Sequence, residues 1–301
     1  MTAKRNRGPQ GWLEYGPYLL PIMIGFLAIV AVPLAFNVWF SLHSWKGGRA
    51  PMRWVGLNNY AALFTDGEFL TSFSNSLYMI MAIVVIPTIL GLVLASVVFN
   101  LVAPRYGQQI AAFLRASYYL PQILPIAVAG FIWSWILNGQ DGALNSALGR
   151  LGLPTPDWLG DPNYAMSAVM MMLVWLQLGY PVVVFMSALG RVDPSVYEAA
   201  DLAGANWWNQ LRSITIPEIR PEIFIVVLTA TVGALKVFAP ILILTGGGPE
   251  GSTLVPSYYA YRNFFELSKV GYGSAISTFM AIVILIIAAF MMWYQRRAEE
   301  N

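Results

Sequence analysis

The residues best suited to chemistry lie in one polar stretch, residues 191–217, which reads RVDPSVYEAADLAGANWWNQLRSITIP. Glu198 and Asp201 are three positions apart, so a helix would place both carboxylates on one face. The residues around them are mostly alanine, whose small side chains let another body approach closely. The stretch predicts either a docking surface or, because Ser195 and Glu198 have capping-box spacing, the start of an ordinary surface helix.

Residues for catalysis or metal binding are scarce. The chain contains no cysteine, and His43 is its single histidine, so thiolate ligands, cysteine nucleophiles and most general-base arrangements are excluded. The Gly-rich run 245–249 lacks the G-x-x-x-x-G-K-[ST] pattern of a phosphate-binding loop, and that pattern occurs nowhere in the sequence. A net charge of +2 does not argue for nucleic acid. We predict neither an enzyme nor an ATPase, and no metal or cofactor in this chain.

The polar stretch should fold as a helix, a tight turn and a second helix. Asp193 followed by proline is a typical helix start, since the carboxylate caps free N–H groups and proline suits the first turn. Gly204 suits the left-handed residue that ends a helix, and Asn206 suits the cap of the second one. Pro217 and Pro221 are expected to end this second helix.

The rest of the chain is apolar enough to define its class. Charged residues make up 11% of it, where a soluble domain has about 25%, 57% are hydrophobic and the mean hydropathy is +0.61. A tail, 1–17, would precede one transmembrane domain, 18–301, that contains the loop 191–220. At about 1.5 Å per residue, six apolar runs can each cross a hydrocarbon layer of about 30 Å. We predict an all-α, polytopic membrane protein with spans at 18–42, 76–102, 117–137, 164–189, 223–244 and 274–294.

The basic residues set the expected orientation. With both termini in the cytoplasm, ten of the 17 lysine and arginine residues face the cytoplasm, six face outside and one lies in a span. Basic residues favour the cytoplasmic side of a membrane protein. This bias places the loop 191–220 in the cytoplasm.

The polar stretch resembles a known motif. Glu198-Ala199-Ala200, with Gly204 six residues after the glutamate and then Ile214-x-x-Pro217, is similar to the EAA loop of permease subunits of ATP-binding-cassette (ABC) importers. In that family the loop is a coupling helix that docks into a groove on the ATPase subunit, with the glutamate pairing with a basic residue there. Many members have x-Asp where this chain has Asp201-Leu202. The resemblance implies a set of ATPase-coupling residues: Glu198, Ala199, Ala200, Asp201, Ala203, Gly204, Ala205, Ile214 and Pro217.

Two shorter segments resemble the carbohydrate-type branch of that family. Residues 56–60, GLNNY, are similar to its G-L-x-N-Y signature. Val237-Phe238 and the later run TGGGP are similar to its V-F…L-T-x-G-G-P segment at the outer end of the fifth helix, as in maltose and glycerol-phosphate importers. Ala239 stands where many relatives have aspartate. The resemblance implies a periplasmic loop, although glycines also make an ordinary flexible turn; its residues would be Thr245, Gly247, Gly248 and Pro249.

The resemblance also implies an assembly. A type I ABC importer permease has a five-helix core and an outlying first helix, and it pairs in membrane lipid with a second, homologous permease. Two ATPase subunits, which hold ATP and Mg, and an extracytoplasmic solute-binding protein would complete the transporter in the plasma (inner) membrane of a prokaryote. The implied function is import of a di- or oligosaccharide, or of a related polyol or glycerol-phosphate solute, by alternating access.

Candidate residues for the translocation path lie within the predicted spans. Lys236 is about 20 Å along the fifth span, where a charge costs about 2.5–3.5 kcal/mol, so it should face a cavity, a partner or the interface. It either lines the path and donates to solute hydroxyls or reaches toward the outer headgroups. Trp133 either stacks on a sugar or belongs to an aromatic belt. The expected path residues are Lys236, Gln177, Tyr180, Phe238 and Trp133.

Two other classes compete with the importer. A secondary transporter would use inverted repeats and an ion site near the midplane, whereas this sequence has no convincing repeat and no carboxylate within a predicted span. A membrane-embedded enzyme would need a catalytic constellation, which the composition does not supply. Dependence of uptake on a partner ATPase separates the importer from both classes. The sequence does not name the solute.

Overall fold

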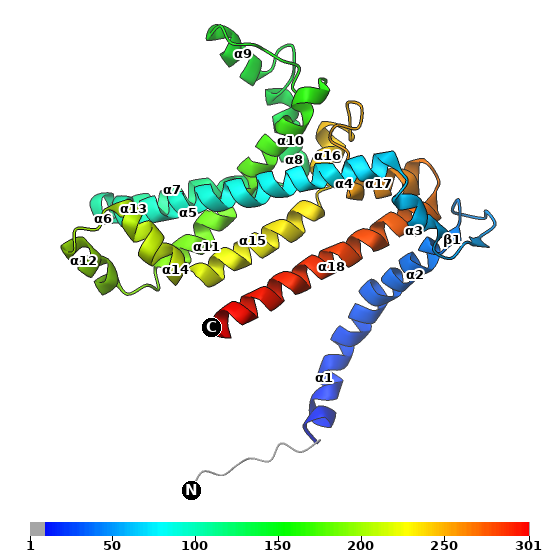
Figure 1. The fold of residues 1–301 in the computed structure, drawn as a ribbon, viewed down its shortest axis with the longest axis horizontal. Helices are drawn as coiled ribbons and strands as arrows, with labels where there is room; N and C mark the ends of the chain where they lie inside the picture. The colour runs from blue at the N-terminus through cyan, green and yellow to red at the C-terminus, as the bar shows by residue number, and fades with distance from the viewer. Residues whose placement is uncertain (1–9, 301) are drawn as a thin grey trace.

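The structure is almost entirely helical. The computed structural model describes the backbone of residues 10–300 and the side chains of residues 18–297. In this part of the chain the strands are β1 (His43–Ser44) and β2 (Arg53–Trp54), an antiparallel pair. The long helices run between this hairpin at one end and the polar stretch at the other (Figure 1). The predicted all-α class is confirmed.

Four helical segments are long and apolar enough to cross a membrane: Tyr18–Ser41, Gly67–Tyr106, Pro162–Leu189 and Val270–Arg297. They coincide with the predicted first, second, fourth and sixth spans. A fifth candidate is a bent pair, α7 (Gln108–Ile123) and α8 (Ile126–Ile136), whose axes differ by 95°. In the predicted fifth span, α15 (Arg220–Leu235) has 16 residues. The described residues are therefore compatible with six crossings, of which length and composition identify four, or five with the bent pair.

The predicted third and fifth spans are not continuous helices, and that part of the prediction was wrong. Within 117–137, α7 ends because Leu124 is extended (ψ 134°) ahead of Pro125, and proline disfavours the helical conformation in the residue before it. Within 223–244, α15 ends at Leu235, and α16 (Ala239–Leu244) begins after a break at 236–238. Residues from both breaks line one cavity, described below.

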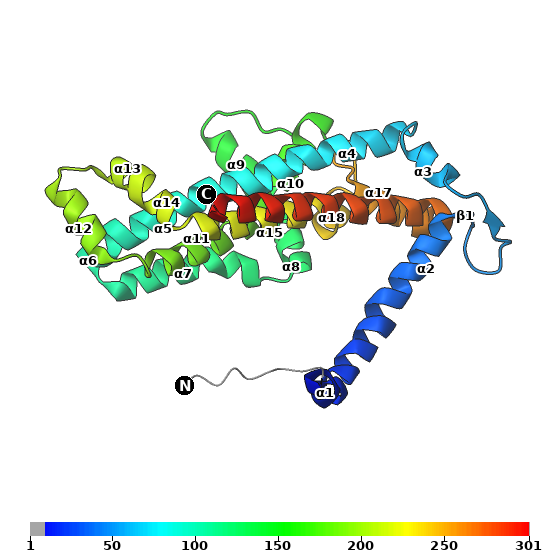
Figure 2. The ribbon, with the colours of Figure 1, turned by 60° about the horizontal axis from the view of Figure 1, so that its bottom comes forward.

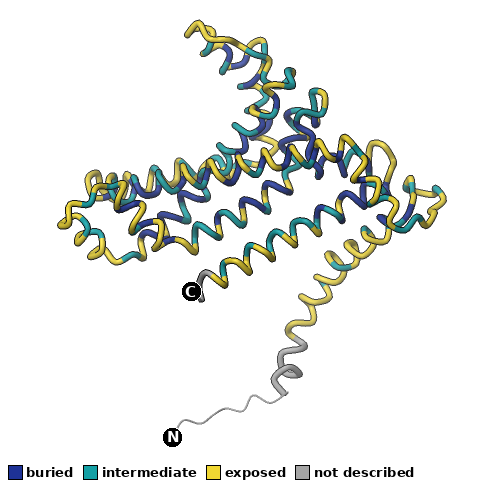
Figure 3. Tube along the Cα trace, viewed as in Figure 1, coloured by how far each residue is buried: buried dark blue, intermediate teal, exposed yellow. Residues whose placement is uncertain are grey.

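The first span stands apart from the other helices (Figure 2). None of its apolar window is buried, and it appears exposed along most of its length in Figure 3. Near the hairpin it contacts α18 (Val270–Glu300), where the Asn37 amide donates to the Thr278 hydroxyl at 2.9 Å. The predicted outlying first helix is therefore present. Its segments are α1 (Gln10–Phe26), the π turn η1 (Leu27–Ala31) and α2 (Val32–Ser41).

The predicted tail, 1–17, is described only in part. Residues 1–9 lie outside the described residues, and residues 10–17 belong to α1. The helix therefore begins earlier than the predicted start of the first span at residue 18.

The second span is a rod that runs from one end of the molecule to the other (Figure 1). Its 40 residues, Gly67–Tyr106, correspond to about 60 Å of helix. It packs along α11 (Gly179–Leu189), and a Cβ on Gly91 would lie 2.5 Å from the Cβ of Pro181, so only glycine allows this approach. The rod comprises α4 (Gly67–Ile80), η2 (Met81–Val85), α5 (Ile86–Val97), η3 (Val98–Val102) and α6 (Ala103–Tyr106).

The fourth span bends where it crosses α7. Its two helices, α10 (Pro162–Gln177) and α11, are separated at Leu178. A Cβ on Gly179 would lie 2.4 Å from the Tyr118 carbonyl oxygen, so the missing side chain lets α11 touch the α7 backbone. Together with α8 and α9 (Ala143–Arg150), α10 forms an arm that rises from the long helices (Figure 1).

Polar side chains join several helix ends near the hairpin. Asp66 caps α4 by accepting from the backbone N–H groups of Glu68 and Phe69, and it also accepts from the hydroxyls of Tyr259 and Tyr272. These contacts tie the start of the second span to α18 and to two short segments, α17 (Pro256–Tyr261) and η5 (Arg262–Glu266).

The GLNNY segment has a structural role at the same end. It leads into α3 (Asn58–Leu63), where the Asn59 amide donates to the carbonyl oxygens of Ser41 and His43 at 2.8 and 2.9 Å. The hydroxyls of Tyr60 and Ser41 are hydrogen-bonded at 2.5 Å. This segment therefore anchors the end of the first span to the rest of the chain.

Candidate coupling and translocation sites

The first helix of the polar stretch begins as predicted. Asp193 caps α12 (Pro194–Leu202) by accepting from the backbone N–H of Ser195 at 3.0 Å, and this hydrogen bond lowers the pKa of the Asp193 carboxyl. Because Asp193 occupies the cap, Ser195 and Glu198 do not form the capping box that was the alternative explanation of the glutamate.

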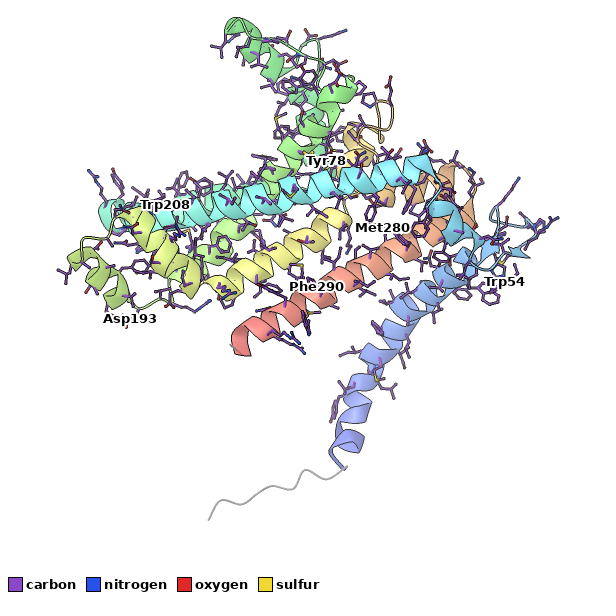
Figure 4. The ribbon with its side chains drawn as sticks, viewed as in Figure 1. Trp54, Tyr78, Asp193, Trp208, Met280 and Phe290 are labelled. Atoms are coloured by element: carbon purple, nitrogen blue, oxygen red, sulfur yellow. The ribbon has the colours of Figure 1, made fainter. Side chains whose placement is uncertain are left out.

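The turn and the start of the second helix also follow the prediction. Gly204 has a φ of +76°, in the region that favours glycine. Asn206 then caps α13 (Trp207–Gln210) by accepting from the Asn209 N–H at 2.9 Å. In Figure 4, Asp193 and Trp208 mark the two arms at the end of the molecule far from Trp54.

The second arm ends between the two predicted prolines. Pro217 lies in the first turn of α14 and Pro221 in the first turn of α15, where a missing N–H is tolerated. The break falls between them, at Ile219. The second arm therefore ends where it was predicted to end, although each proline lies in the first turn of a helical segment; the segments are α13, η4 (Leu211–Thr215), α14 (Ile216–Glu218) and then α15.

The predicted coupling residues form much of the outer surface of this helix–turn–helix. None of the side chains of α12 is buried. The exposed residues of the set are Glu198, Ala199, Asp201, Ala203, Gly204 and Pro217, and the half-buried ones are Ala200, Ala205 and Ile214.

The two carboxylates of α12 differ in their surroundings. Asp201 accepts a hydrogen bond from the side-chain amide of Gln210, which is 8% exposed and also donates to the Ala205 carbonyl oxygen. Glu198 makes no such bond to another described side chain, and it is therefore the acid left available to a partner. Next to Asp201, Leu202 is 92% exposed. Sequence reasoning missed this leucine, although an apolar residue inside a polar surface helix was the available signal.

A cavity of about 240 Å³ opens beside both helix breaks. Its wall is mostly apolar, with three polar side chains from different helices: Gln122 of α7, Gln177 of α10 and Thr229 of α15. Thr229 donates to the Ile225 carbonyl oxygen at 2.8 Å, which leaves its lone pairs as acceptors. Neither glutamine amide is hydrogen-bonded to another described residue. The cavity therefore offers amide donors and acceptors in an apolar wall, a combination suited to the hydroxyls of a small uncharged solute.

Of the predicted path residues, only Gln177 lines this cavity with its polar group. Trp133 packs edge to face on Trp175, with ring centroids 5.8 Å apart, and Phe238 packs against Tyr258 and Tyr261. Tyr180 packs against the buried cluster around α5 and α11. These three aromatic residues contribute to the core. Gln122 and Thr229 were missed because they lie far from Gln177 in the sequence, and only the folded structure brings their helices to the same cavity.

Lys236 lies at the end of α15, at the break in the fifth predicted span. Its side chain is exposed, and its neighbour Val237 lines the cavity. The helix break thus places the lysine outside a continuous helix, and its side chain is not among those that line the cavity.

The Gly-rich loop is an ordered turn. The Thr245 and Thr253 hydroxyls are hydrogen-bonded at 2.7 Å, and Thr253 donates to the Gly248 carbonyl oxygen at 2.9 Å. Gly247 (φ +80°) packs against the Tyr258 ring. Gly247 and Gly248 line a cavity of about 380 Å³ whose wall also includes Glu68, Glu250 and Arg262. In the part of the chain that the structure describes, no group of acidic residues and histidine is arranged to hold a metal ion.

Long apolar helices, an outlying first span and an exposed helix–turn–helix define a permease-type membrane protein. Residues 101–300 match the family described as "Binding-protein-dependent transport system inner membrane component". The chain is 31% identical to the probable ABC transporter permease protein YurN of Bacillus subtilis, over 94% of this chain and 96% of that protein. It is 30% identical to the trehalose/maltose transport system permease protein MalF of Thermococcus litoralis, over 89% and 88%.

The chain therefore belongs to the family of binding-protein-dependent transport system inner membrane components and is an ABC-transporter permease, not an enzyme. The resemblance drawn from the EAA loop is confirmed. The fold is also similar to a crystal structure of a bacterial ABC transporter that imports the acidic polysaccharide alginate, with a TM-score of 0.81, 24% identity and 96% of both chains covered. The predicted importer-permease fold is confirmed by this likeness.

Proposed function

We propose that this chain is the permease subunit of an ATP-driven importer that moves a sugar or a closely related polyhydroxylated solute into a prokaryotic cytoplasm. Support comes from relatives named as sugar permeases, among them the trehalose/maltose protein and the sulfoquinovosyl glycerol permease SmoG of Agrobacterium fabrum, 29% identical over 92% of this chain. The observation that carries the proposal is α12, an acidic helix without a buried side chain at one end of the long helices.

In the proposed assembly, α12 docks into a groove on an ATPase subunit. Glu198 pairs with a basic residue there, the alanines admit close approach, and Leu202 adds apolar contact. A second permease, a second ATPase subunit and a solute-binding protein complete the complex, and the ATPase subunits hold ATP and Mg. Support for the solute-binding protein is that a chain with a TM-score of 0.82 to this one was solved in complex with an alginate pentasaccharide-bound periplasmic protein. The helix–turn–helix then lies in the cytoplasm, with both termini on that side.

Reversing the charge at Glu198 tests the docking role. We expect Glu198→Lys to lower the amount of ATPase subunit that co-purifies with the permease by about tenfold or more, because it places like charges in a desolvated contact. Uptake of radiolabelled maltose, trehalose and diacetylchitobiose into proteoliposomes that hold the complete complex should fall in parallel. Glu218→Lys, the same change at an exposed position of α14, is the matched control. Normal assembly and uptake in Glu198→Lys would rule out the docking role.

The cavity is the proposed passage for the solute. Gln177→Leu should raise the half-saturating concentration of the transported sugar about three- to tenfold, because a hydrogen bond to a hydroxyl is lost, and should leave assembly unchanged. Gln109→Leu, an exposed change on α7 outside the cavity, is the control. An unchanged half-saturating concentration would remove Gln177 from the path. The sugar assignment would be contradicted if the complex took up none of the three sugars while a solute that is not a sugar stimulated its ATPase activity.

A further inference from the structure

Side chains of the helix–turn–helix contact the second span directly. The Trp207 indole Nε1 donates to the Ser96 hydroxyl oxygen at 3.2 Å, although the two residues are 111 positions apart. Ser96 lies on α5, is 0% exposed, and also accepts from the Asn100 amide at 3.3 Å. A partly buried indole–hydroxyl contact of this kind, with the hydroxyl fully enclosed, fixes one element against the other.

The two arms of the helix–turn–helix are also joined to each other. Gln210 of α13 donates to Asp201 of α12 and to the Ala205 carbonyl oxygen in the turn. On the other side, the Tyr197 and Thr215 hydroxyls are hydrogen-bonded at 3.0 Å, and Thr215 is 0% exposed. These contacts make α12, the turn and α13 one unit, so that a force on α12 moves α13 as well.

From these contacts we propose that Trp207 and Ser96 are positioning residues that fasten the helix–turn–helix to the second span, which carries its displacement to the opposite end of the permease. The inference rests on the proposed docking of α12 to an ATPase. The rod of α4 to α6 reaches from this contact to Asp66, where Tyr259 and Tyr272 attach it to α17 and α18. The helix–turn–helix is joined in sequence to the fourth and fifth spans, so its movement passes to them directly. The hydrogen bond between Trp207 and Ser96 adds the second span as a further route.

Asp201 acquires a different role in this arrangement. It is held by Gln210 within the same loop, so its function is to keep the two arms together while Glu198 faces the partner. The two acids of α12 therefore have different roles: Glu198 contacts the partner, and Asp201 holds the two arms together.

The first test measures coupling in the complete complex reconstituted in proteoliposomes. Trp207→Phe and Ser96→Ala each remove one hydrogen-bonding group and keep most of the packing. We expect both to retain ATPase subunits and ATP hydrolysis, and to lower solute taken up per ATP hydrolysed about three- to tenfold. The double variant should be no worse than either single one, because the same contact is removed. Trp208→Phe is the matched control, since Trp208 is 59% exposed and its indole is not hydrogen-bonded to any described residue of α5.

The second test follows movement of the rod. Because the chain has no cysteine, spin labels can be attached to cysteines introduced at Ser74 of α4 and Ser146 of α9, both exposed. ATP binding should change the distance between the labels in the otherwise unsubstituted chain, and Trp207→Phe should abolish the change. The proposal would be overturned if ATP binding left the distance between the labels unchanged in the chain that keeps Trp207, or if Trp207→Phe did not diminish the change. It would also be overturned if Trp207→Phe took up as much solute per ATP as Trp208→Phe. Loss of ATPase subunits in Trp207→Phe would also overturn it, whereas normal assembly in Glu198→Lys would instead refute the docking on which it rests.

Discussion

Asp66 is a single carboxylate shared by four donors. One oxygen accepts from the backbone N–H groups of Glu68 and Phe69, at 3.0 and 3.2 Å, and the other from the hydroxyls of Tyr259 and Tyr272. Partial burial acts to raise the pKa of Asp66, but the four hydrogen bonds outweigh it, so the pKa lies below its ordinary value. Burial and the bond to Asp66 together raise the pKa of Tyr259. The aspartate is therefore ionised in the folded protein at neutral pH.

Removing this charge should weaken the end of the molecule near the hairpin. We expect Asp66→Asn to lower the free energy of unfolding by about 1–3 kcal/mol at neutral pH, because a helix cap and two charge-assisted hydrogen bonds become neutral ones. Thermal unfolding of the purified permease complex in detergent measures the loss. Asp141→Asn, on the exposed loop before α9, is the control and should leave the unfolding temperature unchanged.

The same substitution tests how the stability contributed by Asp66 depends on pH. Since the pKa of Asp66 is lower in the folded than in the unfolded state, its ionised form contributes stability above about pH 4, and this contribution is lost as the pH falls through the folded-state pKa. The difference in unfolding temperature between the unsubstituted protein and Asp66→Asn should therefore be constant from about pH 7 to pH 5 and shrink below about pH 4. A difference that grows on acidification would contradict this account.

The two acids of α12 show what residue spacing resolves and what it does not. Spacing predicted correctly that Glu198 and Asp201 share one exposed helix, capped by Asp193. It gave no means of separating their roles, because the partner of Asp201, Gln210, lies across a turn whose geometry decides which side chains meet. Leu202 lies on the same helix, but its sequence position does not show whether a leucine there packs in the core. Only the structure shows that it is exposed.

At the scale of elements, apolar runs located the four spans that are long continuous helices and failed at the two breaks. The bend at Leu124 has a local cause, the following proline, which the sequence displays; yet Pro87 and Pro104 lie within the first turns of helical segments without a comparable bend. Proline alone therefore does not fix a break, because neighbouring helices decide whether the freed backbone groups are satisfied. The break at 236–238 lies in an apolar stretch that reads as one span in sequence.

Contacts between elements were beyond the sequence for a related reason. Gly91 and Gly179 are ordinary glycines by local pattern, but each marks a place where one helix backbone touches another. Likewise, nothing near Ser96 indicates Trp207, and nothing near Gln177 indicates Gln122 or Thr229. A single sequence shows which residues share one face of a helix. Which helix faces contact each other depends on the packing of the whole chain.

At the scale of the whole molecule, the remaining prediction is orientation. The helix–turn–helix and the hairpin lie at opposite ends of the long helices, and the α8–α10 arm projects from them (Figure 1). The proposed mechanism needs the helix–turn–helix in the cytoplasm, where ATP is available, and the excess of basic residues favours that side for it. The part of the arm that carries α9, residues 138–161, then faces outside, since an apolar span on each side connects it to cytoplasmic segments.

Single cysteines in this cysteine-free chain test the orientation directly. Ser146→Cys on α9 and Ser195→Cys on α12 place thiols at exposed positions of the arm and the helix–turn–helix. In right-side-out membrane vesicles a membrane-impermeant maleimide should label Ser146→Cys and spare Ser195→Cys, and inverted vesicles should give the reverse. Detergent-solubilised protein, in which both sites should react, controls for intrinsic reactivity. Labelling of both sites from one side of sealed vesicles would contradict the topology and, with it, any docking of α12 to a cytoplasmic ATPase, because a charged helix cannot exchange sides across the hydrocarbon layer during transport.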